Sequence, residues 1–287
     1  MIRRWLGVFA LTVLALAAGT AVAAEMFGYP PATALDEVRQ RVDKAPAGHP
    51  RLLADKATLA GLRKAADSDP WAQMVAAAVV REAESLADAE PVQRQLQGRR
   101  LLGVSRRAVG RVLALAAAYH LTGDLRHAAR CEREMLAAAE FSNWNPSHFL
   151  DVGEMTFALA IGYDWLFEQL TPEGRKQIRQ AIVEKGVRLP WETRYNGWVR
   201  ASNNWGQVCH GGMTAGALAV LEDEPDLAAK TVHSALQNLP CLWGSRAAAL
   251  RPATDKWTSA RSCSTATASA GHTTWAPKAI TASSRGA

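Results

Sequence analysis

The sequence has only four cysteines among its 287 residues, and none of them stands in a metal-binding motif. Cys131, Cys209, Cys241 and Cys263 are 78, 32 and 22 residues apart, without a C-x-x-C pair. This spacing argues against a zinc ribbon and against a dense disulfide framework. We expect buried free thiols, with one oxidised pair as the alternative, and we expect neither a metal nor a cofactor.

Long apolar runs are absent after the first 24 residues. Residues 1–24 combine Arg3 and Arg4 with an apolar stretch and small residues near position 23, which is the pattern of a secretory signal peptide. No later stretch approaches the roughly 20 apolar residues that a membrane span needs. We therefore expect a periplasmic or secreted protein without stable membrane insertion. An uncleaved anchor and the twin-arginine export route are the alternatives.

Excess positive charge is absent from the body of the chain, although the whole sequence has a net charge of +6. Residues 25–240 hold 25 basic and 26 acidic side chains, so the excess lies at the two ends. A nucleic-acid-binding domain needs a basic surface of its own. The sequence therefore predicts no nucleic-acid partner.

Alternation of apolar and polar residues, which indicates strands, is missing before residue 240. Helical signals fill that region and repeat as helix–turn–helix hairpins. The hairpins that we expect cover residues 106–140, 151–187 and 207–239. The sequence thus predicts an all-α fold, in which a lead-in arm at residues 25–54 precedes an incomplete (α/α) toroid at residues 55–240.

The clearest single helix is expected to begin at residue 70. Asp69 is a capping residue, and Pro70 suits the first helical position. Trp71, Met74, Val75, Ala78 and Val79 follow at helical spacing. This spacing predicts an amphipathic helix that buries these apolar side chains.

Residues 241–287 lack the side chains that build a core. Of these 47 residues, 26 are Ala, Ser or Thr, and Phe, Val and Tyr are absent. Such a composition cannot offset the conformational entropy that is lost on ordering. We expect a disordered low-complexity tail, or a segment read out of frame after about residue 240.

Two segments between the expected helices are rich in aromatic and amide side chains. The residues that stand out are Trp144 and His148 in residues 141–155, and Asn203, Asn204, Trp205 and His210 in residues 191–213. Aromatic faces can stack on sugar rings, while amides bind hydroxyls and carboxylates. The same composition suits the packed corners of a helical domain equally well.

Acidic side chains near these segments have simpler interpretations. Asp151 and Glu154 lie where a helix begins, and we expect them to complement the helix dipole. Asp164 and Glu168 share one helical face, and we expect these like charges to point to solvent.

Three segments carry a more specific pattern. They read H-P-R-L-L-A at residues 49–54, H-F-L-D-V-G-E-M-T-F-A-L-A-I-G-Y-D-W-L-F at residues 148–167 and S-N-N-W-G-Q-V-C-H-G-G-M at residues 202–213. Together they resemble the amino-terminal half of the heparinase II/III-like polysaccharide lyases, over about residues 45–240. The resemblance implies an (α/α) toroid that precedes a β-sandwich, and cleavage of uronate-containing polysaccharides by β-elimination.

The resemblance also implies roles for single residues. Asn204 matches the family asparagine that neutralises the substrate carboxylate, with Asn203 as the alternative one position away. Trp205 stands where some members have histidine, and His210 stands where relatives often have asparagine. The family tyrosine lies further downstream, whereas the last tyrosine of this chain is Tyr195. The chain is therefore expected to lack the complete acid and base pair.

These observations favour an exported polysaccharide lyase relative that acts on acidic polysaccharides or oligosaccharides and is catalytically incomplete. Trp144, His148, Asn203, Trp205 and His210 are the expected substrate-binding residues, and Asn204 is the expected catalytic residue. One alternative is a non-catalytic, carbohydrate-binding helical fragment. Another is an α/α-barrel glycoside hydrolase, which would need two carboxylates on opposite sides of a cleft.

Overall fold

Capping residues, glycines and prolines divide residues 33–239, the part of the chain that the computed structural model describes, into helices and short turns. No strand is present in these residues, so the all-α fold class is confirmed for them. None of their helices has both the length and the apolar character to cross a membrane. The predicted signal peptide and the predicted low-complexity tail lie outside the described residues.

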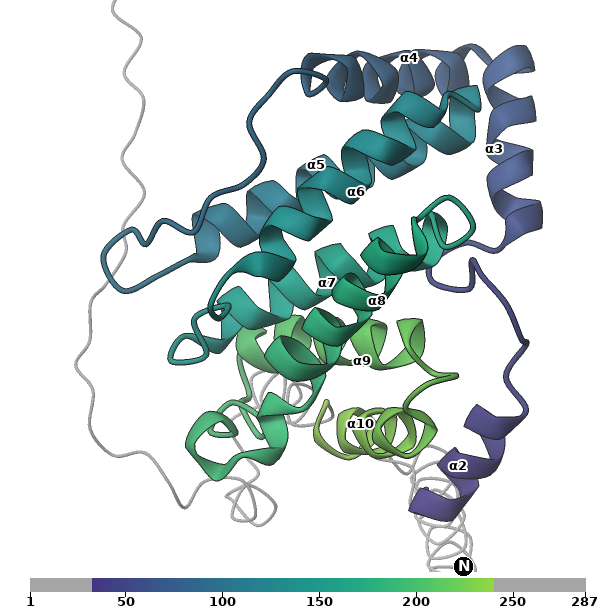
Figure 1. The fold of residues 1–287 in the computed structure, drawn as a ribbon. Helices are drawn as coiled ribbons and strands as arrows, with labels where there is room; N and C mark the ends of the chain where they lie inside the picture. Colours follow the sequence, from purple (N-terminus) through teal and green to yellow (C-terminus); the bar gives the residue numbers. More distant parts are fainter. Residues whose placement is uncertain (1–32, 240–287) are drawn as a thin grey trace, which may run out of the picture. The chain divides into compact units, whose positions relative to one another are not determined.

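The helices are α2 (Leu35–Asp43), α3 (Lys56–Ser68), α4 (Pro70–Ser85), α5 (Leu102–Thr122), α6 (Leu125–Glu140), α7 (Phe149–Trp165), α8 (Pro172–Ile182), α9 (Asn204–Ala219) and α10 (Pro225–Asn238) (Figure 1). A π-helical turn, Val183–Val187, continues α8. Two 3-10 turns, Leu189–Trp191 and Thr193–Tyr195, then lead toward α9.

The helix ends follow the capping residues that the sequence displays. Asp69 caps α4, and Thr171 caps α8 through its hydroxyl. Gly123 takes a left-handed conformation with φ of 77°, which ends α5, and Asp124 caps α6. The pairs α5 and α6, α7 and α8, and α9 and α10 match the three predicted hairpins.

The first helices of the three hairpins, α5, α7 and α9, lie side by side and run in the same direction. Arg106 near the start of α5 pairs with Glu154 near the start of α7, while His120 near the end of α5 contacts the carbonyl of Trp165 at the end of α7. In Figure 1, α6 and α8 lie on the near side of α5 and α7. Helices α5, α7 and α9 thus form one layer, and α6 and α8 lie in a second.

The close approach of α7 and α9 depends on glycine. A Cβ atom on Gly212 would lie 2.1 Å from the backbone oxygen of Gly153, and one on Gly216 would lie 2.5 Å from the methyl group of Thr156. Any larger side chain at residue 212 would force the helices apart. The contact brings the amino-terminal ends of both helices to the same end of the layer.

A buried carboxylate fixes the segment before α3. Asp164 is fully buried, and its Oδ2 accepts hydrogen bonds from the backbone N–H groups of Arg51 and Leu52 at 2.8 and 2.7 Å. Its Oδ1 lies 2.6 Å from Nδ1 of His49. The expectation that Asp164 points to solvent is therefore wrong, because these three donors replace the water that the carboxylate loses.

The predicted buried face of α4 is exposed. Trp71, Met74 and Val75 are 74%, 54% and 56% exposed, whereas Ala83 is only 1% exposed. The helix packs mainly against α3 and α5, and Val79 and Val80 are partly buried against the core. The spacing correctly predicts the helix, but the prediction of which face it buries is wrong.

Cys131 and Cys209 are buried and free, as predicted, while Cys241 and Cys263 lie outside the described residues. Burial raises the pKa of both described thiols above the ordinary range. A thiol must ionise to react, so a raised pKa makes both thiols unreactive. Their role is to pack in the core.

Replacing Gly212 by alanine should lower the free energy of unfolding by about 1–3 kcal/mol, because the new methyl group overpacks the contact with α7. Gly211 is the matched control, since nothing lies within 4 Å of a Cβ atom built on it. Gly211→Ala should raise the free energy of unfolding by about 0.5–1 kcal/mol through helix propensity alone. Urea denaturation measures both changes, and equal effects would contradict the proposed role of the contact.

Candidate functional site

The two aromatic segments meet at the amino-terminal ends of α7 and α9. His148 precedes α7, and the edge of its ring meets Trp205 with centroids 4.9 Å apart and planes at 75°. Both side chains are half-buried, so each keeps part of its surface in solvent. The glycine contact between α7 and α9 places these two rings together.

Asp151 orients the ring of His148. Its Oδ1 lies 2.7 Å from Nδ1 of His148, and its Oδ2 accepts from the backbone N–H of Leu101 and from Nδ2 of Asn145, both at 2.6 Å. A carboxylate accepts hydrogen bonds, so in the neutral ring Nδ1 carries the proton and Nε2 is left as an acceptor. Asp151 is fully buried and therefore positions this histidine, beyond the helix-end role that the sequence indicates.

Asn203 and Asn204 take different roles at the start of α9. The side-chain oxygen of Asn203 accepts from the backbone N–H of Trp205 at 3.0 Å and caps the helix. Asn204 is the first residue of α9, and its side chain is exposed beside Trp205. Asn203 is therefore used as the helix cap, whereas the side-chain amide of Asn204 is not part of the cap.

Two of the expected binding residues are in the core instead. Trp144 is fully buried, and its indole N–H donates to the carbonyl of Ala138 at 2.9 Å. His210 is 3% exposed, with Nε2 lying 2.9 Å from the carbonyl of Val199. Neither ring has an exposed face for a ligand, so their burial gives the prediction that Trp144 and His210 bind substrate no support. They hold loops against the helices.

A group of exposed arginines borders the site, and the sequence analysis missed it. The backbone carbonyl of Arg99 accepts from Asn145, which places the start of α5 against the loop before α7. Arg99, Arg100 and Arg106 are exposed, and Arg106 pairs with Glu154 at 3.2 Å. The signal was available, because the segment Q-G-R-R-L-L-G-V-S-R-R is the most basic stretch near the predicted loops.

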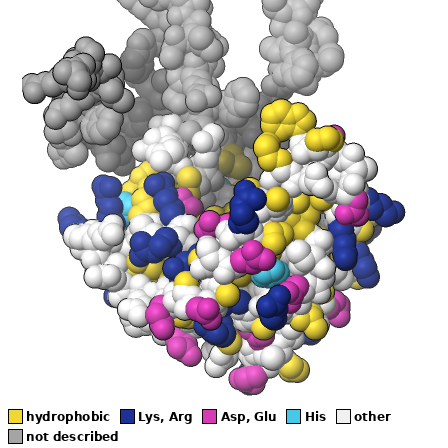
Figure 2. Space-filling model, turned by 90° about the horizontal axis from the view of Figure 1, so that it is seen from above, with side chains coloured by type: hydrophobic (Ala, Val, Ile, Leu, Met, Phe, Trp, Pro, Cys, Tyr) yellow, Lys and Arg dark blue, Asp and Glu magenta, His cyan; other side chains and the backbone are white. Residues whose placement is uncertain are grey.

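These charges are local. On the face drawn in Figure 2, basic and acidic side chains are interspersed, in line with the charge balance of the body of the chain. At the site, the amino-terminal ends of α5, α7 and α9 add partial positive charge to that of the arginines. The surface is therefore suited to an anion that also carries hydroxyl groups, with the ring of Trp205, the amide of Asn204 and Nε2 of His148 as contacts.

The described part of the chain contains no cluster of side chains that could bind a metal ion. Across residues 33–239, no three His, Cys, Asp or Glu side chains gather closely enough to hold a metal ion. The paired acid at the site, Glu154, already binds Arg106, and Asp151 is saturated by its three donors.

The burial of His210 predicts a pH dependence. Burial lowers the pKa of His210 below its ordinary value, and the hydrogen bond to Val199 offsets part of this shift. The unfolded chain thus binds a proton more readily, so the contribution of His210 to stability is present above about pH 6.5 and is lost as the pH falls.

Urea denaturation at pH 7.5 and 5.5 should show a smaller loss of stability for His210→Gln than for the unchanged protein. The difference cannot exceed about 1.4 kcal/mol per pH unit for one group. Identical losses in both proteins would contradict the assignment.

Comparison of the chain with protein-family models and with curated proteins finds no match.

Proposed function

We propose that this protein is a relative of the polysaccharide lyases that binds acidic polysaccharides or oligosaccharides at the glycan surface, defined as His148, Asn204, Trp205 and Arg106. The contact between the rings of His148 and Trp205 above the buried Asp151 carries the proposal. It combines an aromatic face with an oriented histidine. Arg106 contacts Glu154 through Nε only, so its terminal N–H groups are left to donate to a carboxylate.

The resemblance to the heparinase II/III-like lyases would make the three hairpins part of an incomplete (α/α) toroid. The parallel arrangement of α5, α7 and α9, with α6 and α8 in a second layer, supports this proposal. In such a toroid the ends of the first-layer helices line the ligand cleft. The glycan surface lies at one of these ends.

Elimination from a uronate needs three things: neutralisation of the carboxylate, a base for the C5 proton and an acid for the departing oxygen. We assign the first task to Asn204, whose side chain is exposed at the start of α9. His148 is oriented for proton transfer, but the tyrosines of residues 33–239 have other ring contacts. Tyr163 packs on His49 and Phe167, Tyr119 packs on His120, and the guanidinium of Arg194 lies over the ring of Tyr195. We therefore expect binding without turnover.

The glycoside hydrolase alternative gains no support from the described residues. An inverting or retaining pair needs two carboxylates that face each other across a cleft. Asp151 is buried under three hydrogen bonds, and Glu154 is paired with Arg106. Neither is available as a free acid or nucleophile.

Titration of oligo-uronates should give a Kd near 1 mM, because stacking and neutral hydrogen bonds contribute only about 1 kcal/mol each. Trp205→Ala and Asn204→Ala should each weaken binding by about fivefold. Trp71→Ala is the matched control, since it removes an exposed tryptophan from α4. Calorimetry or ligand-observed NMR measures the affinities, and circular dichroism verifies folding.

Two results would contradict the proposal. Equal affinity in all four proteins would remove the assignment of the glycan surface. Ultraviolet absorbance of an unsaturated uronate product would show that the chain is an active lyase and that the expected lack of turnover is wrong.

Export through a cleavable signal is part of the same proposal and has its own test. The pattern of residues 1–24 predicts a mature chain that begins at Ala24 or Glu25. Mass spectrometry of periplasmic or secreted protein determines the start. Exported material that still begins at Met1 would refute cleavage.

A further inference from the structure

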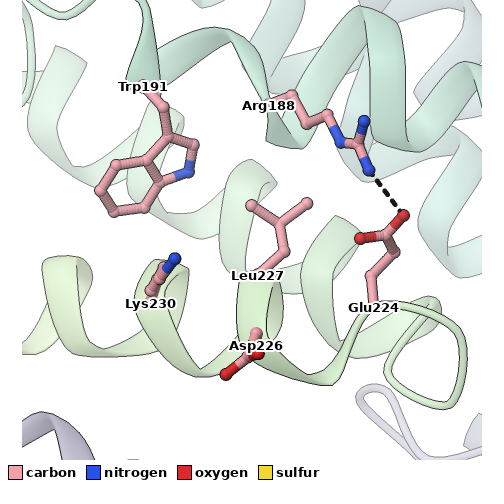
Figure 3. Close-up of a pocket in the computed structure, with 6 residues that line it drawn as sticks. All are labelled: Arg188, Trp191, Glu224, Asp226, Leu227 and Lys230. Carbon is pink, nitrogen blue, oxygen red and sulfur yellow. Dashed lines mark hydrogen bonds and ion pairs between the residues drawn. The ribbon is translucent and has the colours of Figure 1, made fainter.

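A pocket of about 350 Å³ opens between the turn that follows α8 and the first half of α10 (Figure 3). The residues that line it are Arg188, Trp191, Glu224, Asp226, Leu227 and Lys230. None of them belongs to the glycan surface, so the pocket is a separate feature of the same fold.

Most charges of this pocket are already paired. Arg188 pairs with Glu224 at 2.8 Å and with Glu184 at 3.0 Å. Asp226 pairs with Arg39 at 3.2 Å, and Arg39 also pairs with Asp36 at 2.8 Å. Lys230 is exposed and forms no ion pair with any residue between positions 33 and 239. Lys230 is therefore the cation of the pocket lining that no carboxylate pairs with.

The remaining lining is apolar. Trp191 is 49% exposed, and Leu227 is half-buried beneath the opening. In Figure 3 the ammonium group of Lys230 lies on the same side of the pocket as the indole of Trp191, with Leu227 between them and the pair of Arg188 and Glu224. A ligand with a flat apolar ring could therefore stack on Trp191 with the ammonium group of Lys230 beside it.

We propose that this pocket binds an aromatic carboxylate, with the ring against Trp191 and Leu227 and the carboxylate on Lys230. One unpaired cation matches one negative charge. A sugar acid is less suited, because the apolar side chain of Leu227 offers its hydroxyl groups no hydrogen-bond partner.

The probe for this proposal is 2-naphthoate, titrated against the full-length, ¹⁵N-labelled chain while the tryptophan indole N–H signals are followed by NMR. The signal that disappears in Trp191→Ala identifies Trp191, and we expect this signal to shift with a Kd near 1 mM. Lys230→Met should weaken binding about tenfold, because it removes a charge-assisted hydrogen bond. Trp191→Ala should weaken it by a similar factor when the naphthoate resonances are followed.

Two controls match these variants. Lys176→Met removes an exposed lysine of α8 that does not line the pocket, and Trp71→Ala removes an exposed tryptophan of α4. Neither should change the affinity for naphthoate. Lys230 is exposed, so Lys230→Met tests the proposal even if Trp191→Ala fails to fold.

The neutral amide 2-naphthamide and the hydroxylated acid glucuronate separate the contributions of charge and ring. Both should bind at least about tenfold more weakly than naphthoate. Equal binding of the amide, unchanged affinity in Lys230→Met, or preferential binding of glucuronate would overturn the proposal. The glycan surface does not contain Trp191 or Lys230, so its own test can fail or succeed independently.

Discussion

The backbone contact between Gly153 in α7 and Gly212 in α9 decides where the candidate site can form. It lies one to two turns inside both helices, so a displacement at this point moves the two amino-terminal ends apart. His148 and Trp205 are at those ends, and their ring contact depends on the helix separation. The close packing of Gly153 and Gly212 thus positions the side chains of His148 and Trp205.

The central helix α7 is also tied at both ends by buried aspartates. Asp151 receives donors from the start of α5 and from the loop before α7, while Asp164 receives them from the segment before α3. A buried carboxylate without donors would be strongly unfavourable, so each loop is held to the helix by the need to solvate the charge. The two aspartates of α7 therefore fix the conformation of the loop before α7 and of the segments before α3 and α5.

Helix ends could be predicted from the sequence because capping is local: Asp69 and Gly123 act on atoms within a few residues. The buried faces could not. Trp71 is exposed because no later helix covers that side of α4 in the described part of the chain. Trp144 is buried in the core, where its indole N–H donates to Ala138 of α6. The environment of Asp164 was missed for the same reason, since its donors are more than a hundred residues away in sequence.

Sequence separation of this size has a consequence for the order of folding. Thr33 accepts a hydrogen bond from His233, which is 200 residues later, and His49 waits for Asp164, which is 115 residues later. At a synthesis rate of 5–20 residues per second, His233 is made about 10–40 s after Thr33. The hairpins, whose contacts are local, can form as they are synthesised. Among the helices of residues 33–239, α2 is thus made first and completed last.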